Sequence, residues 1–588
     1  MSLRTRSAVR APVGVSTPAR PRCGFRVWAG VLALALAGCS AKHYRESADK
    51  AAYGAIAAKS RRVVNMDPHF TLDQTNTVSL DNLPRLEQPP NFLGEWAETE
   101  RGAAVLSLDK ALAIAVHASR VYQNSKEQLY LSALSYTLTQ NQFTPIFSGA
   151  GSANYAVQTE KLVRYEIDEI TGEPKPIISD ALVEQSLVRT DGSVGVSWLL
   201  RDIGRITAAF TTDFTRFLVS GGGAAANSQL GATFTRPLLR NAGYKREIEA
   251  LTQSERNLLY QVRDFVRFRK SFSVDIARDY YNILGSRDAC RNAFLRLGSA
   301  RRNREQGQAL AREGRRTQSD LGRLETDELT AESSWIEEVR NYKRALDNFK
   351  IKLGLPVETK LVLDDQELTA LAIHHPKIKV EDSIRVALEA RLDYQNVHDQ
   401  FDDSQRQVKL AADALKTQLD LNAAGSISSP PEVASGFPLP DENRYRWNAG
   451  LIVDLPLERT AERNAYRQAL INQDQAVRAL SQRHDEIELE VRESWRTLEQ
   501  AKRTFEINDI GVKLAERRVE EQELLAELGR ARAQDQVDAQ TALLQSRNAR
   551  TQALVGHTIA RLQFWDNMGI LYIKDNGQWE ELENAKAQ

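Results

Sequence analysis

Residues 445–455 read Tyr-Arg-Trp-Asn-Ala-Gly-Leu-Ile-Val-Asp-Leu, and they alternate between two kinds of side chain. Tyr445, Trp447 and the residues at 449, 451, 453 and 455 are aromatic or apolar, whereas most residues between them are polar or small. A period of two places successive side chains on opposite faces of an extended chain. The segment therefore predicts a β-strand with one apolar face. After Pro456 the chain contains no further proline and is rich in Ala, Glu, Gln, Arg and Leu, which indicates long helices.

The same alternation recurs in five other segments, which makes six candidate strands. The five are residues 147–155, 194–200, 206–214, 230–234 and 419–423. In each, one face is apolar or aromatic and the other is small or polar. We expect Trp198, Tyr445 and Trp447 to form an aromatic girdle of the kind found where strands cross a membrane surface.

The proline-free blocks predict two long helical hairpins. Residues 245–312 and 463–527 are helical in composition, and each block stops near a glycine, Gly314 or Gly529. Glycine suits the left-handed turn that ends a helix. After Gly314, apolar residues recur at spacings of three, four and seven, as in the seam of a returning, coiled-coil-like helix. Each hairpin is too thin to bury a core of its own, so we expect it to pack against its repeat mate and against other chains.

The chain contains an internal repeat. The segment that begins at Leu108 matches the one at Val380 (offset 272), Pro237 matches Pro456 (offset 219), and Gly314 matches Gly529 (offset 215). The fall from 272 to 219 means that the first copy carries 53 extra residues, at about 159–228, with a flexible loop at Gly221 to Ala226. We divide the chain into a signal peptide (1–38), an N-terminal segment (39–105), repeat 1 (106–356), a connector (357–377), repeat 2 (378–571) and a tail (572–588).

The N-terminus is typical of a bacterial export signal. Residues 1–26 are rich in arginine without an acidic residue, and a short apolar run ends in Leu-Ala-Gly-Cys at 36–39. This tetrapeptide is similar to a lipobox, which implies cleavage before Cys39 and acylation of its thiol. Ser40 in the next position is consistent with sorting to the outer membrane. The alternative is an ordinary signal peptide in which the cysteine is incidental.

Composition excludes several classes of protein. Lys+Arg and Asp+Glu are both 78, and a zero net charge argues against a nucleic-acid-binding protein. Beyond the N-terminus no apolar run reaches the ~20 residues of a membrane-spanning helix, which excludes a helical transporter. The alternating strands fit a soluble sandwich or a closed barrel, and the export signal favours the barrel wall. Since even small barrels need about eight strands, several chains must cooperate.

No pattern indicates an enzyme, a metal site or a cofactor. The histidines do not form a ligand motif such as H-E-x-x-H. The adjacent His374 and His375 are expected to be polar linker residues. The pair Asp402 and Asp403 is expected on a solvated helix face. Cys290 is expected to be a small buried residue and not a reactive thiol.

Two copies of helix, strands, long helix, glycine turn and returning helix, on a lipoprotein, resemble the TolC-like outer-membrane efflux proteins. Leu-Ser-Leu-Asp-Lys-Ala-Leu-Ala-Ile-Ala at 106–115 is similar to that family's opening helix, and Arg-Pro-Leu-Leu at 236–239 to its Gln-Pro-Leu-Leu. Gly529 with Asp535 and Asp538-Ala is similar to its Gly-x5-Asp-x-x-Asp-Ala. The family's Asn-Pro after the opening helix is missing in both copies. The 53-residue insertion leaves open whether a chain has four strands or six.

The resemblance implies a mostly α-helical chain with a β-barrel contribution. Three chains would share one barrel in the outer-membrane lipid and form a helical tunnel in the periplasm. As partners it implies a periplasmic adaptor, or membrane fusion protein, and an inner-membrane pump. The function implied is the exit duct of an efflux or type I secretion system, with drug, metal and polypeptide cargo all open. The competing interpretation is a lipid-anchored periplasmic coiled-coil scaffold or adaptor without a pore.

The resemblance also assigns residues to the narrow periplasmic end. Acidic rings that gate the pore and select cations would consist of Asp320, Asp535 and Asp538. The alternative for these acids is a solvated helix face. Basic residues that pair across chains at the gate would be Arg315, Arg530 and Arg532. The adaptor would dock at the turns around Gly314 and Gly529.

Overall fold

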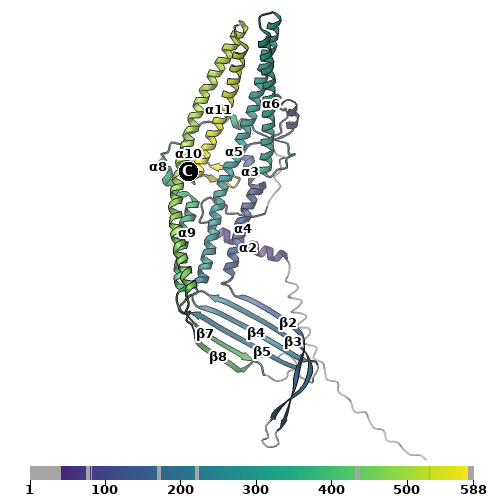
Figure 1. Ribbon diagram of the computed structural model, residues 1–588, viewed down its shortest axis with the longest axis vertical. Coiled ribbons are helices and arrows are strands. Elements are labelled where there is room, and N and C mark those ends of the chain that lie inside the picture. The colour runs from purple at the N-terminus through teal and green to yellow at the C-terminus, as the bar shows by residue number, and fades with distance from the viewer. Residues whose placement is uncertain are drawn as a thin grey trace, which may run out of the picture.

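The computed structural model describes residues 41–73, 80, 83–167, 174–218, 224–430, 438–528 and 530–580. The molecule is elongated, with a β-sheet at one end and two helical hairpins that reach to the other (Figure 1). The signal peptide and Cys39 lie outside the described residues, as does Gly529. Within the described ranges, every helix is too short or too polar to span a membrane.

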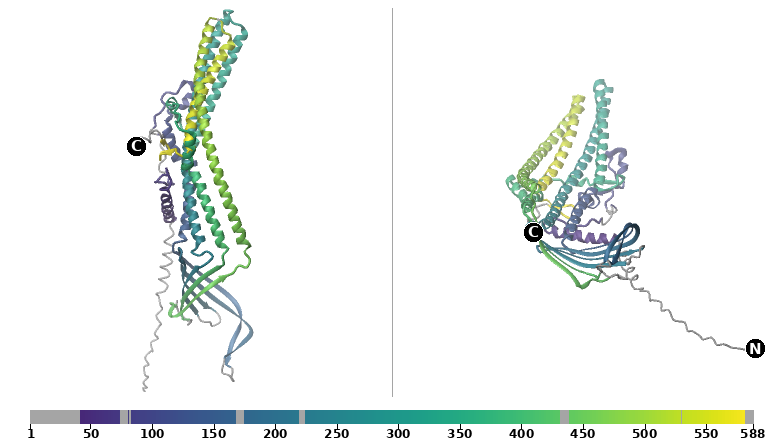
Figure 2. Two further views of the ribbon diagram at one scale, coloured as in Figure 1. Left: turned by 90° about the vertical axis from the view of Figure 1, so that its left-hand side faces the viewer. Right: turned by 60° about the horizontal axis from the view of Figure 1, so that its bottom comes forward.

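Two long hairpins form the helical part, as expected from the proline-free blocks. The first consists of α5 (Lys245–Arg312) and α6 (Gln318–Leu353), and the second of α10 (Thr460–Glu527) and α11 (Ala533–Asn567). Both α5 and α10 have 68 residues, which is about 100 Å at the rise of an α-helix. The four helices run side by side in both views (Figures 1 and 2).

Each hairpin is preceded by a pair of shorter helices. Repeat 1 has α3 (Leu108–Ala118) and α4 (Arg120–Asn141), and repeat 2 has α8 (Val380–Ala390) and α9 (Leu392–Ala414). Both helices of the second pair begin 272 residues after their counterparts. One extended residue separates each pair, Ser119 with ψ 126° and Arg391 with ψ 120°.

The sheet contains six antiparallel strands in the order β2-β3-β4-β5-β7-β8. They are β2 (Ile146–Ile167), β3 (Pro174–Leu200), β4 (Gly204–Phe217), β5 (Ala224–Pro237), β7 (Gln418–Ser428) and β8 (Asp441–Asp454). All six candidate segments are therefore strands. β7 begins 272 residues after β2, and β8 ends close to the proline that matches the end of β5.

This correspondence identifies the inserted residues as β3 and β4, which lie between the counterparts of β7 and β8. The flexible loop expected at 221–226 is only partly tested. Residues 219–223 are not described, and Ala224 to Ala226 begin β5, so that part of the expectation is wrong. The backbone of Ala224 to Ala226 is paired with Arg216 to Phe214 of β4, which satisfies its hydrogen-bonding groups as a strand.

The remaining elements wrap the middle of the hairpins. They are α2 (Ala41–Ser60), η1 (Asn91–Glu100), β1 (Ala104–Leu106), which pairs in parallel with β6 (Leu361–Leu363), α7 (Gln366–Thr369), β9 (Tyr572–Ile573) and β10 (Trp579–Glu580). A buried ion pair holds η1 against the first hairpin, because Arg287 of α5 donates to both Glu100 oxygens at 2.8 and 2.9 Å. Cys290 is fully buried in the same core, as expected.

Candidate functional site

The register of the sheet collects the apolar side chains on one face. Residues directly opposite each other in antiparallel strands point to the same side. Trp447 lies opposite Gly425, which lies opposite Ala232. This row of cross-strand neighbours, here called a rung, continues through Ala208 and Val196 to β2. The next rung joins Tyr445, Ile427, Leu230, Phe210 and Val194. A slip of one residue in any strand would send its apolar set to the other face, so this register is strongly specified.

This apolar face is open to the surroundings. Trp447 is 74% exposed, Tyr445 69% and Val194 63%. In β8 the alternating residues cover 445–455, which is the 9–11 residues that a tilted strand needs to cross a bilayer's hydrocarbon core. Such a large exposed apolar surface requires a cover of lipid or protein.

The three aromatic residues expected to form a girdle lie within one band of the sheet. Trp198 faces Ile206, and this rung passes through β5 and β7 to Ala449. It is therefore adjacent to the rung of Trp447, which is adjacent to that of Tyr445. The position of this band relative to a membrane surface stays a prediction.

The opposite face of the sheet is polar. Ser152, Asp191, Asp213 and Asn227 face one another in sequence across β2, β3, β4 and β5. They line a hollow of about 430 Å³ together with threonines, glycines and Ser193. Directly opposed carboxylates repel each other, and Asp191 is partly neutralised by Arg189, which donates to it at 3.1 Å. A polar face opposite an apolar face is the arrangement of a barrel wall around a channel.

The sheet is open at both edges. Its outer strands are β2 and β8, and in the described residues each has one neighbour only. An exposed edge presents unpaired N–H and C=O groups, which cannot stand in a hydrocarbon layer without partners. A second strand from another chain would satisfy them.

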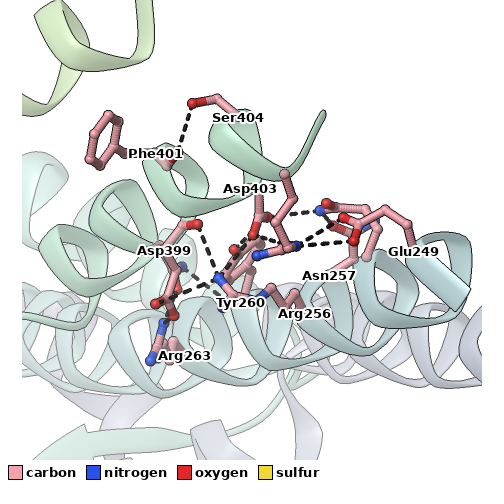
Figure 3. Close-up of polar contacts among 12 residues, drawn as sticks. Glu249, Arg256, Asn257, Tyr260, Arg263, Asp399, Phe401, Asp403 and Ser404 are labelled. Carbon is pink, nitrogen blue, oxygen red and sulfur yellow. Dashed lines mark hydrogen bonds and ion pairs between the residues drawn. The ribbon is translucent and has the colours of Figure 1, made fainter. Parts of the chain in front are cut away.

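A buried polar network joins the two helices that lead into the sheet (Figure 3). Asp403 of α9 is 6% exposed and accepts from Gln253, Arg256 and Tyr260 of α5 at 2.9, 2.9 and 2.7 Å. Arg406, one turn further along α9, donates to Asp403 at 2.6 Å. Burial, reinforced by Asp403, raises the pKa of Tyr260, so its hydroxyl remains a donor. The expectation that Asp403 lies on a solvated face is wrong, because that face is covered by α5.

At the far end of the first hairpin, Gly314 has φ +73°, the left-handed conformation that ends α5. The N–H of Arg315 donates to the carbonyl of Leu310 at 2.9 Å, as in a Schellman turn. The Thr317 hydroxyl then accepts from the N–H of Asp320 at 3.1 Å and caps α6. Both the N–H and the carboxylate of Asp320 thus bond to Thr317 within the cap of their own helix. The residue is half-buried in the first turn of α6.

The second tip places Asp535 and Asp538 on the exposed side of the first turns of α11. Asp538 accepts from Gln534 at 2.8 Å. Arg530 and Arg532 are also exposed, whereas Arg315 of the first tip forms an ion pair with Glu313 at 3.7 Å. Pairing of these arginines across chains stays a prediction.

Arg316 joins the two tips, although the sequence did not single it out. Its guanidinium donates to Gln536 of α11 at 2.9 Å and to the carbonyl of Ala531 at 3.4 Å. The link spans 220 residues. Its position two residues after the turn glycine was the only available signal.

Two histidine groups merit attention as ligands. His398, Asp399 and Asp402 come close enough to hold a metal ion, but Asp399 already accepts from Arg263 at 2.7 Å, which neutralises its charge. His375 lies in the connector between α7 and α8, as expected for a linker residue, and its ring also lies beside that of the buried His557 of α11, with centroids 6.2 Å apart.

No protein-family model and no curated protein matches the sequence, but solved structures share the fold. The Campylobacter jejuni CmeC outer membrane channel aligns with a TM-score of 0.57 at 13% identity, over 89% of this chain and 97% of that one. The outer membrane protein VceC of Vibrio cholerae aligns with 0.57 at 12%, over 79% and 96%. The open state of the Neisseria gonorrhoeae MtrE outer membrane channel aligns with 0.54 at 13%, over 79% and 89%. The chain thus has the fold of these outer-membrane channels, and the resemblance to TolC-like proteins is confirmed at the level of the fold.

Proposed function

We propose that the protein is the outer-membrane exit duct of a multi-component efflux or type I secretion system. It receives substrates from an inner-membrane pump through a periplasmic adaptor and releases them outside the cell. The observation that carries this proposal is the sheet. Six strands in strict register place apolar side chains on one face and polar ones on the other, and two hairpins of about 100 Å continue from it.

In this proposal several chains close one barrel. Six strands are too few for a barrel, and the edges of β2 and β8 pair with neighbouring copies. The fold resemblance favours a homotrimer. Three chains of six strands each make a barrel of about eighteen, against about twelve for chains of four, and barrels of about eighteen strands leave an aqueous channel. The inserted strands β3 and β4 supply the difference.

The proposed gate lies at the tips of the hairpins. Symmetry brings the exposed Asp535 and Asp538 of each chain toward the axis, with Asp320 near the same level. Two carboxylates about 6 Å apart in water repel by only about 0.7 kcal/mol, so the acids set cation preference and do not hold the gate shut. Pairing of Arg315, Arg530 and Arg532 across chains contributes to closure, and the turns at Gly314 and Gly529 receive the adaptor.

We place the protein in the outer membrane with a large periplasmic portion, anchored by acylation of Cys39. A lipid chain contributes about 0.8 kcal/mol for each buried CH₂, which holds the chain at the membrane while the barrel assembles. Mass spectrometry of the protein purified from membranes would test the anchor. An N-terminal peptide that begins at Cys39 with an acyl mass is expected, and an unmodified Cys39 would contradict it.

Conductance of the detergent-extracted protein in a planar lipid bilayer tests the channel. Discrete, cation-selective steps are expected. A matched control for the gate acids is Glu98→Gln, an equally charged exposed residue on η1, 65% exposed and far from the tips. A folded protein that inserts no channels, and that leaves membranes as a wholly helical species once the lipid is removed, would favour the periplasmic scaffold.

A further inference from the structure

His557 is a buried residue with unsatisfied polar atoms. Its side chain is 1% exposed, and neither ring nitrogen has a hydrogen-bond partner among the residues that the structure describes. Nδ1 of His375, on the connector between α7 and α8, is buried and unpartnered as well. Buried polar groups in native proteins are nearly always paired, and an orphan calls for a bound water, an ion or a functional role. Here three orphaned nitrogens belong to two rings that contact each other.

The distance between these rings suits a shared metal ion. Their centroids lie 6.2 Å apart with the planes inclined by 37°. A metal about 2 Å from one nitrogen of each ring, with the nitrogens on opposite sides, puts the centroids about 6 Å apart. The ring centres would therefore not need to move. The absence of a direct hydrogen bond between the rings agrees with this separation.

Aromatic side chains close one side of the site. Trp495 covers His375 with a centroid distance of 5.4 Å, and Phe564 packs on Trp495 at 5.4 Å. Two imidazole nitrogens beside aromatic side chains offer few donor atoms. They therefore suit a copper-like ion that needs few ligands.

We propose that His375 and His557 form a binding site for a monovalent soft metal ion, Cu(I) or Ag(I), held between the connector and α11. The ion satisfies nitrogens that are otherwise orphaned and ties the connector to α11, the last long helix of repeat 2. The site does not depend on the channel proposal, because its test measures binding by the purified protein and not transport.

The test uses the full-length protein in detergent, with Ag(I) in chloride-free buffer as the probe. Bound silver is counted by elemental analysis after gel filtration, in the parent and in His557→Gln, His375→Gln and the control His484→Gln, an exposed histidine. The thiol of Cys290 is common to all samples and cancels in the comparison. We therefore expect the parent and the control to bind one more equivalent of silver per chain than either cluster variant.

Two further measurements sharpen the result. His557→Met keeps a soft thioether, so it should retain Ag(I) binding and lose any Zn(II) binding. Circular dichroism checks that each variant is folded. If His557→Gln unfolds, silver binding by the variant at the half-buried His375, His375→Gln, tests the site in its place. Unchanged silver binding in both glutamine variants, or no binding in the parent, would overturn the site. Histidine-dependent binding of Zn(II) without Ag(I) would overturn the monovalent ion.

Discussion

Replacing Asp403 with alanine should loosen the junction between sheet and tunnel. The carboxylate is 6% exposed and accepts hydrogen bonds from the side chains of Gln253, Arg256, Tyr260 and Arg406. Figure 3 shows Arg256 and Tyr260 beside it. α5 follows β5, and α9 precedes β7, so the network fixes the angle at which two neighbouring strands meet their helices. Loss of the acceptor leaves several donors in a place that water does not reach.

The cost can be worked out from the partners that remain. Tyr260 loses a hydrogen bond to a charged acceptor, and such a bond contributes about 1.5–3 kcal/mol to the free energy of unfolding. Arg256 keeps its ion pair with Asp399, and Arg406 keeps its ion pair with Glu249. The charge of each guanidinium therefore stays partly neutralised. The hydrogen bond from Gln253 and the partial loss at the two arginines add about 1 kcal/mol. The total of about 3–4 kcal/mol lies near the lower end of the roughly 3–5 kcal/mol for breaking a buried ion pair.

Thermal unfolding in detergent, followed by circular dichroism, measures this cost. If the 550 residues from Cys39 onward (588 − 38) unfold together, about 2.1 cal/mol/K per residue converts 3–4 kcal/mol into a fall in Tm of about 3 °C. The matched control is Asp402→Ala on the same helix, for which the described residues give no hydrogen bond or ion pair. A cycle with Tyr260→Phe should show that the two changes are not additive. Equal melting of the Asp403 and Asp402 variants would refute the reasoning.

Four other changes test the remaining assignments. Asp535→Asn with Asp538→Asn should lower the cation-to-anion permeability ratio in planar bilayers without loss of channels; an unchanged ratio would remove these acids from the gate. Gly314→Trp, which adds bulk to an open turn, should abolish export in cells but leave heat-modifiable oligomers on SDS gels; normal export would reject docking there. Burial raises the pKa of Asp566 to about 6 despite nearby cations, so the folded state binds this proton more tightly and its contribution to stability falls as pH rises from about 4 to 6. Asp566→Asn should flatten the dependence of Tm on pH in that window, and parallel profiles would contradict this. Cryo-electron microscopy of a chain that lacks β3 and β4 should show a narrower barrel, with two fewer strands per chain; a barrel of unchanged width would mean that these strands lie outside it.

Much of the fold was predictable because local periodicity carries it. The alternation from 445 to 455 and in the other five segments identified every strand of the main sheet. The two offsets of the repeat, 272 and 219, identified the inserted residues before any contact was known. The first part of the insertion and its end were harder to predict than the segments 194–200 and 206–214. The polar stretch after residue 159 has weak alternation, and the glycine run suggested only a loop.

The side-chain clusters were not predictable in the same way. Asp403 stands among charged residues on α9, and only the packing of α5 against that face makes it buried. His375 lies in a short connector, and its partner His557 is 182 residues away in sequence (557 − 375). Such pairs depend on how the two repeats dock, for which one sequence holds no periodic signal.

The insertion changes the sheet but not the helices, and this has a mechanical consequence. In the proposed barrel, whose diameter grows about linearly with strand number, six strands per chain in place of four widen the opening by about half. The described residues of the insertion form β3 and β4 and add no helix to the proposed tunnel, so the strands of that barrel flare outward from their helices. The turn before α5 is rigid, because Asn241 and Tyr244 both have positive φ, and Tyr244 donates to the carbonyl of Thr235 at 2.7 Å. Asp413 at the end of α9 accepts from the N–H of Asn241 at 2.8 Å. The wider mouth is therefore set by fixed turns and by the Asp403 network, and loosening either should act on the barrel before the tunnel.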